Sequence, residues 1–368
     1  MKILFVTNLP SPYRVEFFSE LAKECDLTVL YDYRSSTERN PLWKAQSQNN
    51  FKSVFLKGLH FGTHWCLSWA IIKYLKQDFD LVIISSYEGL TEQLAISYLR
   101  QHRIPFALSS DGGFIGDDFW LKKKLKTYLI GSASYYFSPG KFTDKYLEYY
   151  GAQATQIYHY PFTSLYQREI LPRTLSVAEK QQLRRKLNLP GLDYNLVISV
   201  GVPIRRKGFD LLVQAIEALD DPRTKLLLVG ASRAEYEKTL GRKLSSKVLV
   251  VDFLTKPQLW KYYQAVDVFV LATRYDIWGL VINEALANGL PVITTDRCGA
   301  GLELIENGVN GYLVKSESVA ALRQALELTL AQQPLLAENS RHKIQEHSYE
   351  GMVQAHILAI KKIINHQD

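Results

Sequence analysis

A regular alternation between short apolar runs and segments of helical periodicity constrains the fold most. In the first half of the chain the candidate strands are ILFVT (3–7), LTVLY (27–31), VFLK (54–57), LVIIS (81–85), FALS (106–109) and YYFS (135–138). In the second half they are LVISV (196–200), LLLVG (226–230), VLVVD (248–252), VFVLA (268–272) and PVITT (291–295). Apolar residues recur at helical spacing between many of them, as in 14–23 and 209–219. Such alternation predicts an α/β protein with parallel sheets that helices cover on both faces.

The alternation pauses in a polar segment, 163–194, which ends near Pro190 and Gly191. Inside it a helix is expected, with Ser176 as N-cap and Glu179 as its capping-box partner. We place the domain boundary there and expect two doubly wound, Rossmann-like domains. The predicted parts are a domain over 1–165, a linker over 166–192, a domain over 193–345 and a terminal segment over 346–368, with an amphipathic helix at 348–366.

Composition and charge exclude several classes of protein. Hydrophobic residues make up 47% of the 368 and charged residues 22%, as in ordinary globular proteins. Residues 1–170 carry 19 basic and 16 acidic side chains and 171–368 carry 25 and 21, so the excesses of +3 and +4 add to the net charge of +7. This even spread does not indicate a nucleic-acid-binding domain.

The cysteines and the hydrophobic runs indicate a reducing compartment without a membrane span. The three cysteines lie far apart and form no CxxC pair, which argues against disulfides and a structural zinc site. The N-terminal run is interpreted as a first strand and not a signal peptide. No run approaches the roughly 20 apolar residues of a transmembrane helix. We therefore expect a cytoplasmic protein.

A basic loop follows the strand at 196–200. Arg205, Arg206 and Lys207 come just before a helix that starts near Gly208. Loops at the carboxyl ends of parallel strands and helix N-termini both favour anions, so a diphosphate site is the functional interpretation. A solvated basic loop is the alternative.

Two acids, Asp276 and Glu284, flank the junction between a strand and a helix in RYDIWGLVINEALANGLPVITTD. Asp276 is expected in the loop, and Glu284 on the polar side of a helix over 280–288. Gly289 is expected to end that helix. Carboxylates at this edge of a sheet can accept hydrogen bonds from the vicinal hydroxyls of a ribose or sugar. In the alternative Asp276 forms a turn and Glu284 is a surface acid that the helix dipole favours. Trp278 is expected in the core in either case.

These segments resemble glycosyltransferase family 4, which contains retaining enzymes of the GT-B fold. DIWGLVINEALANGLPVI is similar to the family's pattern of Glu, seven residues, Glu and a helix that ends in Gly-Leu-Pro-Val, with the shorter Asp276 in place of the first Glu. VGVPIRRKGFDLL resembles its phosphate loop, and GAGLELIENGVNGYLV resembles its next segment. In the first half, TNLPSPYRVEFFSELAK and SPGKFTDKYLEYYGA resemble a subgroup that builds bacterial surface polysaccharides.

The resemblance implies roles in a donor site. Glu284 corresponds to the acid that holds the nucleotide ribose, and Asp276 to the acid near the donor sugar and its phosphate. Lys207 matches the lysine of the phosphate loop. Val202 replaces the loop's usual arginine, so Arg205 or Arg206 would supply that charge, and we favour Arg206. Such cations would stabilise the leaving diphosphate without a metal or another cofactor.

The first domain would bind the acceptor, facing the second domain across a cleft. The family often has a histidine at the end of a strand in this domain, where this chain has Ser110, Asp111 and Gly112. Asp111 is therefore the catalytic candidate that faces the acceptor hydroxyl, with an Asp-Gly turn as the alternative. Arg14 is the acceptor-binding candidate, with an exposed arginine at a helix start as the alternative. His159 is assigned a structural role, and the C-terminal helix is expected to cross back to this domain.

One segment, FWLKKKLKTYLI (119–130), combines an apolar stripe with four lysines. The stripe contains Leu121, Leu125, Tyr128 and Leu129. The default interpretation is a core helix with a solvated face. The sharper hypothesis is contact with an anionic membrane that carries lipid-linked acceptors.

The sequence as a whole predicts a transferase with the catalytic residues Asp111, Asp276 and Lys207. It would move a sugar from a nucleotide diphosphate donor to a glycan or lipid-linked acceptor, at the inner face of the cell membrane. An oxidoreductase is disfavoured because neither FVTNLPSPYR nor SVGVPIRRKG has the glycine spacing of a dinucleotide fingerprint. A non-catalytic sugar-nucleotide binder or assembly partner stays open as the alternative.

Overall fold

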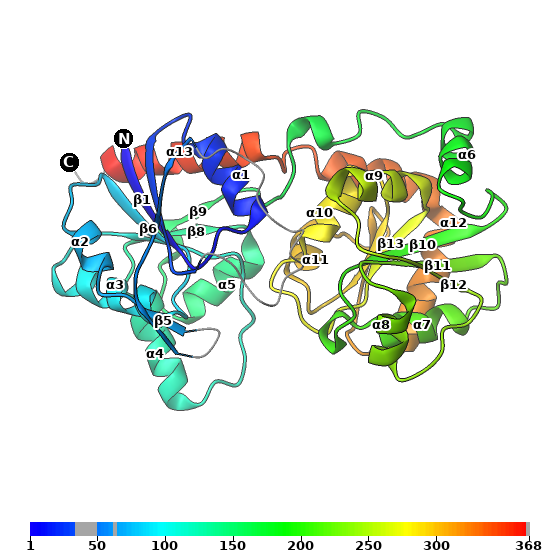
Figure 1. Cartoon of the computed structure of the whole chain (residues 1–368), viewed down its shortest axis with the longest axis horizontal. Coiled ribbons are helices and arrows are strands. Elements are labelled where there is room, and N and C mark those ends of the chain that lie inside the picture. The colour runs from blue at the N-terminus through cyan, green and yellow to red at the C-terminus, as the bar shows by residue number, and fades with distance from the viewer. Residues whose placement is uncertain (34–49, 62–64, 366–368) are drawn as a thin grey trace. The chain divides into compact units, whose positions relative to one another are not determined.

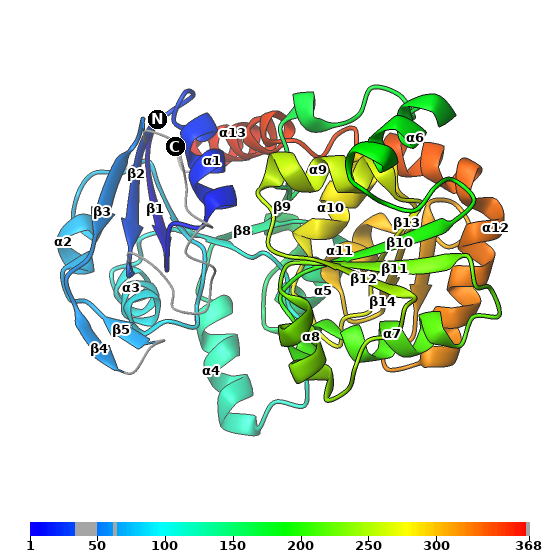
Figure 2. The ribbon, with the colours of Figure 1, turned by 45° about the vertical axis from the view of Figure 1, so that its right-hand side comes forward.

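The computed structural model of the chain describes residues 1–33, 50–61 and 65–365. The chain divides into two compact units (Figures 1 and 2). Unit 1 comprises Met1–Thr163 and Ser348–Asp368, and unit 2 comprises Ser164–His347.

Unit 1 is built on a parallel sheet of seven described strands in the order β3-β2-β1-β6-β7-β8-β9. A separate antiparallel hairpin pairs β4 with β5. The strands are β1 (Lys2–Thr7), β2 (Asp26–Tyr31), β3 (Lys52–Phe55), β4 (Leu59–Phe61), β5 (Trp65–Leu67), β6 (Leu81–Ile84), β7 (Ala107–Ser109), β8 (Tyr135–Ser138) and β9 (Ile157–His159). The helices are α1 (Pro12–Leu21), α2 (Ile71–Leu75), α3 (Leu90–Gln101), α4 (Trp120–Ile130), α5 (Lys141–Tyr149), η1 (Ala154–Gln156) and α13 (Tyr349–Asn365). Helix α13 packs on α1, so the C-terminal helix is part of this unit.

Unit 2 has a parallel sheet of six described strands in the order β12-β11-β10-β13-β14-β15. The strands are β10 (Asn195–Val200), β11 (Thr224–Val229), β12 (Val248–Val251), β13 (Val268–Leu271), β14 (Val292–Thr295) and β15 (Gly311–Val314). The helices are η2 (Gln167–Glu169), α6 (Val177–Lys186), η3 (Arg205–Lys207), α7 (Phe209–Glu217), α8 (Arg233–Leu240), α9 (Lys256–Ala265), α10 (Leu280–Ala287), α11 (Gly299–Leu304) and α12 (Val319–Lys343).

The apolar runs predicted as strands all contain strands, and both main sheets are parallel, as the alternation predicts. The sequence did not reveal β9 or the β4–β5 hairpin. These strands have three residues each, so they lack the longer buried runs that identified the others. The tail helix was expected over 348–366 and is described to Asn365, and residue 366 lies outside the described residues.

The segment 166–192, predicted as a linker, packs within unit 2. Ser176 caps α6 as expected: its Oγ accepts a hydrogen bond from the backbone of Glu179 at 3.3 Å, and its backbone N–H donates to the Glu179 carboxylate at 2.8 Å. Arg184 on this helix is buried, pairs with Asp267 at 2.6 Å and donates to the carbonyl oxygen of Ala265 at 2.7 Å. These bonds hold α6 against the residues that directly precede β13.

The strand orders fix where a ligand can sit in each unit. In unit 1, β2 and β3 are added on one side of β1 and the strands from β6 onward on its other side, so the strand order switches between β1 and β6. In unit 2 the strand order switches in the same way between β10 and β13. At such a switch point the loops that leave the two strands diverge and open a crevice at their carboxyl ends. The loops that carry the candidate donor-binding residues follow β10 and β13.

Within the described ranges, no helix has both the length and the apolar character that crossing a bilayer requires.

Candidate functional site

A glycine fixes the basic loop of unit 2 against the neighbouring strand. After β10 the chain forms the short helix η3 and passes through Gly208, whose φ is 68°. A Cβ at Gly208 would lie 1.8 Å from the carbonyl oxygen of Ala272, just beyond β13. Any other residue would push the two loops apart. The glycine therefore brings the basic loop next to the loop that carries Asp276.

Asp276 lies among the cations of that loop. Its Oδ2 is 2.6 Å from Lys207 Nζ and 3.4 Å from Arg206 Nη1. Arg206 also donates to the carbonyl oxygen of Tyr275 at 2.7 Å. The side chains of Lys207 and Asp276 are only 14% and 15% exposed, so this ion pair is mostly screened from solvent. Lys207 is therefore not a solvated lysine, and Asp276 does more than form a turn.

Arg205 is not part of this cluster. Its side chain is exposed, and its carbonyl oxygen accepts a hydrogen bond from Arg274 Nη1 at 2.7 Å. Of the two arginines proposed for the missing charge, only Arg206 reaches Asp276.

Sequence reasoning missed Arg274, which holds the loop after β13 to the start of α7. Its guanidinium makes two bonds to the Asp210 carboxylate, at 2.8 and 2.7 Å, and a third to Glu317 at 2.7 Å. The hydrogen bonds to Asp210 are the main reason why the pKa of Arg274 is raised. Because Asp210 is in the first turn of α7, Arg274 ties the loop after β13 to the helix that follows the basic loop. These partners are 43 and 64 positions away, so no local pattern identifies them.

Glu284 lies on α10 against Tyr263 of α9. The hydroxyl of Tyr263, which is fully buried, donates to Glu284 Oε2 at 3.1 Å. Burial raises the pKa of Glu284 to about 7, although Lys256 and the Tyr263 hydrogen bond act to lower it and Glu169 adds to the rise. Glu284 is half-buried and accepts a hydrogen bond from Tyr263, so it is not the surface acid of the alternative interpretation.

The rest of this segment folds as predicted. Trp278 is 3% exposed, and its indole N–H donates to Asn283 at 2.9 Å. Helix α10 ends at Ala287, and Gly289 follows with a φ of 70°, as the position after a helix requires.

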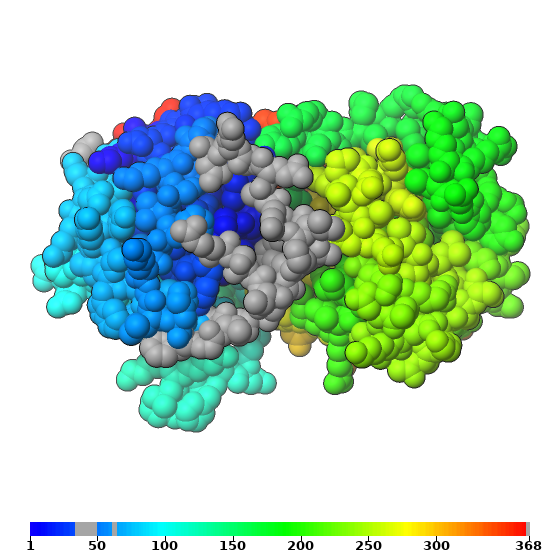
Figure 3. Space-filling view, in the orientation of Figure 1, coloured from blue at the N-terminus to red at the C-terminus, as the bar shows by residue number. Residues whose placement is uncertain are grey.

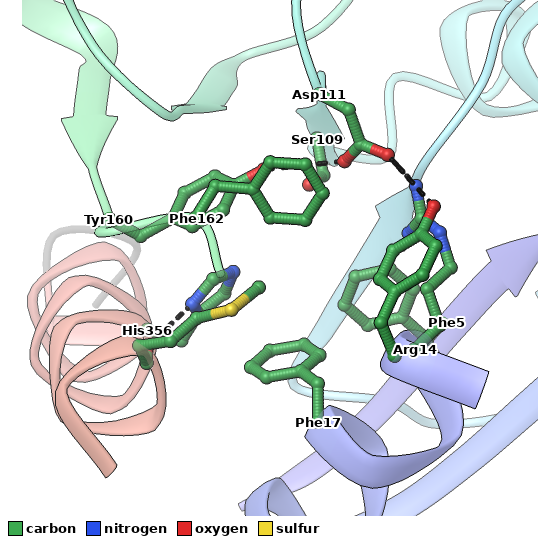
Figure 4. A pocket seen from close by; sticks show the side chains of 10 residues that line it. Phe5, Arg14, Phe17, Ser109, Asp111, Tyr160, Phe162 and His356 are labelled. Atoms are coloured by element: carbon green, nitrogen blue, oxygen red, sulfur yellow. Dashed lines mark hydrogen bonds and ion pairs between the residues drawn. The ribbon is translucent and has the colours of Figure 1, made fainter. Parts of the chain in front are cut away.

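The candidates of unit 1 meet in a small pocket (Figure 4). Arg14 Nη2 donates to Asp111 Oδ2 at 2.7 Å, and the two side chains are 12% and 22% exposed. The hydroxyls of Tyr13 and Tyr160 lie 3.4 and 3.5 Å from the same carboxylate. Burial acts to lower the pKa of Arg14, but Asp111 and the tyrosines outweigh it, so that pKa is raised. Arg14 is thus not an exposed arginine, and Asp111 does more than form a turn.

Sequence reasoning missed other residues that line this pocket, among them Tyr13, Tyr160 and His356. Tyr160 is buried. The preceding residue, His159, is exposed, and its Nε2 lies 2.7 Å from the Asp144 carboxylate, so His159 contacts its neighbour at the protein surface and not in the core. His356 comes from the C-terminal helix and is 1% exposed. The only signal in the sequence was that His356 lies on the apolar face of an amphipathic helix. Residues that line a pocket and residues of the core share this pattern, so it could not identify His356 as a site residue.

The segment 119–130 departs from its default interpretation. In α4 only Leu129 and Ile130 are buried. Leu121, Leu125 and Tyr128 of the predicted apolar stripe are 53%, 47% and 40% exposed. The helix is therefore not a core helix over most of its length.

Comparisons with known proteins agree with this architecture. Over the whole chain the structure is similar to sucrose-phosphate synthase of Thermosynechococcus elongatus, with a TM-score of 0.77, 18% identity and 99% of both chains covered. It is also similar to HepE of Anabaena in complex with UDP and glucose, with a TM-score of 0.75, 17% identity, and 98% of this chain and 100% of HepE covered. The chain therefore has the GT-B fold of glycosyltransferases, as the sequence predicts.

Sequence comparison identifies the second half more closely. Residues 179–351 match the family model of glycosyl transferases group 1. The lipopolysaccharide glucosyltransferase WaaG of Escherichia coli is 27% identical over 172 residues, which cover 45% of this chain and 46% of WaaG. The lipopolysaccharide core biosynthesis glycosyltransferase LpsE of Rhizobium meliloti is 31% identical over 176 residues, 46% of this chain and 48% of LpsE. The chain spans about half the length of these relatives. The similarity to the glycosyl transferases group 1 thus extends over residues 179–351 of the chain.

The raised pKa of Glu284 predicts a pH-dependent stability. Because its pKa is about 7 in the folded chain, against an ordinary value of 4.5, the folded state binds more protons between these values. The free energy of unfolding should therefore fall as the pH rises from 4.5 to 7, by up to about 1.4 kcal/mol per pH unit from this group.

Glu284→Gln keeps an acceptor for Tyr263 and should remove this component, as urea unfolding at several pH values would measure. Glu327→Gln on α12, where the side chain is 53% exposed, is the control. Equal pH dependence in both variants would contradict the assignment.

Proposed function

We propose that the protein is a retaining glycosyltransferase of family 4. It would move a sugar from a nucleotide diphosphate donor to a glycan or lipid-linked acceptor during synthesis of a surface polysaccharide. The observation that carries the proposal is the convergence of Lys207, Arg206 and Asp276 at the switch point of unit 2. The similarity to two lipopolysaccharide glycosyltransferases, WaaG and LpsE, supports the product class, and the UDP and glucose bound to HepE support the donor class.

In this proposal the donor diphosphate lies against the basic loop. Lys207 and Arg206 would pair with its oxygens and stabilise the charge that develops as the bond from the sugar C1 to the phosphate oxygen breaks. Asp276 would give up part of its ion pairs and accept from the donor sugar. Glu284 would accept the two ribose hydroxyls, which requires its ionised form.

The acceptor would bind to unit 1. Its hydroxyl oxygen would form the new bond to C1 on the face from which the diphosphate leaves, and the leaving phosphate oxygen would take the hydroxyl proton. Asp111, held by Arg14, would orient the acceptor hydroxyl. The position of these residues at the carboxyl end of the unit 1 sheet supports this assignment.

The decisive experiment combines donor binding with product analysis. A thermal-shift screen of nucleotide sugars would select the donor, and mass spectrometry would detect transfer to a panel of acceptors. Glu284→Ala should weaken UDP binding at least tenfold by calorimetry, because two hydrogen bonds to a charged group are lost. Glu327→Ala should not. Unchanged binding and transfer in Glu284→Ala would refute the site, whereas tight donor binding without any transfer would favour a non-catalytic sugar-nucleotide binder.

The ion pair in the basic loop predicts opposite effects of two substitutions. Lys207→Ala removes a cation and should weaken UDP binding about tenfold. Asp276→Asn removes the carboxylate that competes with the diphosphate for Lys207 and Arg206, so it should strengthen UDP binding while it reduces transfer. Arg205→Ala should have the smallest effect of the three, because its side chain is exposed and apart from Asp276. Weaker UDP binding by Asp276→Asn would show that no such competition occurs.

We further propose that α4 places the protein on the inner face of the cell membrane. Its N-terminal part projects from the body of unit 1 (Figures 1 and 3) and exposes Phe119, Trp120 and Leu121 by 64%, 61% and 53%. Lys122, Lys123 and Lys124 follow directly, and all three are exposed. Exposed aromatic and apolar side chains beside lysines suit the interface of an anionic bilayer. Asp118 pairs with Lys122 at 3.0 Å and offsets part of this charge.

Liposome sedimentation tests this surface. The pair Lys123→Glu and Lys124→Glu should reduce binding to phosphatidylglycerol vesicles by at least tenfold, since each lysine near the surface contributes about 1 kcal/mol. Trp120→Ala should also reduce it. The exposed unit 2 residues Lys238 and Leu335 supply the matched controls Lys238→Glu and Leu335→Ala. Failure of the wild-type protein to sediment with anionic vesicles at low salt would exclude the membrane contact.

A further inference from the structure

The C-terminal helix brings a histidine into the pocket of unit 1. His356 on α13 is 1% exposed and packs among three aromatic rings. Its ring stacks on Phe137 with centroids 4.8 Å apart and planes 7° apart. Its centroid is 4.6 Å from that of Tyr160 and 4.7 Å from that of Phe17. The ring is thus held in one orientation, beside the Arg14–Asp111 pair (Figure 4).

The surroundings also fix which nitrogen carries the proton. Burial lowers the pKa of His356 to about 4, and Arg14 acts in the same direction, so the ring is neutral near pH 7. Its Nδ1 lies 2.8 Å from the carbonyl oxygen of Met352, which can only accept. Nδ1 therefore holds the proton, and Nε2 keeps its lone pair. In Figure 4 this second nitrogen points toward the space that Tyr160, Phe162 and Phe17 border.

The pocket therefore combines hydrogen-bond acceptors with donors and aromatic walls. Asp111 and His356 Nε2 are acceptors, while Arg14 and the hydroxyl of Tyr13 are donors. Asp111 neutralises Arg14, so the pocket does not favour a phosphate or carboxylate. A hydroxyl group both donates and accepts, and the apolar face of a sugar ring packs on aromatic side chains. These properties match the hydroxyl-bearing edge of a sugar.

We propose that His356 Nε2 accepts a hydrogen bond from a hydroxyl of the acceptor sugar, in a subsite that it shares with Arg14 and Asp111. The proposal rests on the proposed function and adds a residue from the far end of the chain to the acceptor site. It assigns α13 a part in substrate selection besides its packing on α1.

Three substitutions at one position separate this role from packing. Gln places an amide group where Nε2 lies, Asn places one where Nδ1 lies, and Phe keeps the stacked ring without either nitrogen. His356→Gln should keep the acceptor KM within about threefold, whereas His356→Asn and His356→Phe should raise it about tenfold, the effect of one lost hydrogen bond. The affinity for UDP, measured by calorimetry, should stay unchanged in all three.

A purely structural role gives a different pattern. His356→Phe would then be the mildest variant, and changes in KM would follow the loss of thermal stability across the set. An unchanged acceptor KM in His356→Asn with a normal melting temperature would also overturn the proposal.

Direct binding distinguishes failure of this inference from failure of the proposed function. Saturation-transfer NMR with millimolar methyl glycosides of glucose, galactose and N-acetylglucosamine needs neither donor nor turnover. Contact of the wild-type protein with at least one glycoside, lost in His356→Asn and kept in His356→Gln, would support the subsite even if no transfer were detected. Absence of contact in the wild-type protein, or equal contact in all variants, would reject it while leaving the donor site intact.

Discussion

The ion pair between Lys207 and Asp276 is the interaction on which the candidate donor site depends. It joins the two loops that leave β10 and β13, so it forms only because the strand order makes these strands neighbours. Gly208 allows the close approach of the backbones, and Arg274 holds the loop of Asp276 to α7. A mostly buried cation without a carboxylate would be costly, and the pair keeps Lys207 in place before any ligand arrives. A diphosphate can then replace the carboxylate without leaving the cation unpaired.

Unit 1 uses a similar arrangement with different residues. Its first strand, β1, leads into α1, where Arg14 lies in the first turn, and the loop after β7 supplies Asp111. The Arg14–Asp111 pair is surrounded by aromatic rings, whereas Lys207 and Asp276 lie among further charges and backbone carbonyls. An aromatic environment suits a sugar, and a cationic environment suits a diphosphate. The chemistry of the two surroundings thus supports the proposed division between an acceptor site and a donor site.

The sequence predicted those features that depend on local pattern. Apolar runs identified the main strands, and the capping box of Ser176 and Glu179 identified α6. The spacing of Asp276 and Glu284 placed one acid in a loop and one on a helix, as the structure has them. It could not predict the burial of Glu284, because Tyr263 reaches it from α9, 21 positions away. For the same reason it missed Arg274 and His356, whose partners come from distant segments. The apolar stripe of α4 was interpreted as part of a core helix, because an amphipathic pattern alone does not show whether a stripe is covered.

In the proposed function, Glu284 would connect the stability of unit 2 with the binding of a donor. Its side chain is half-buried beside Tyr263, and the loss of contact with water favours the neutral form, so with a pKa of about 7 both forms are populated near neutral pH. A ribose presents two hydroxyl donors, and their hydrogen bonds favour the ionised form. Donor binding would therefore add hydrogen bonds to this carboxylate, and these bonds would lower the pKa of Glu284. In this way a side chain that lowers the stability of unit 2 at higher pH would become a source of affinity for the proposed donor.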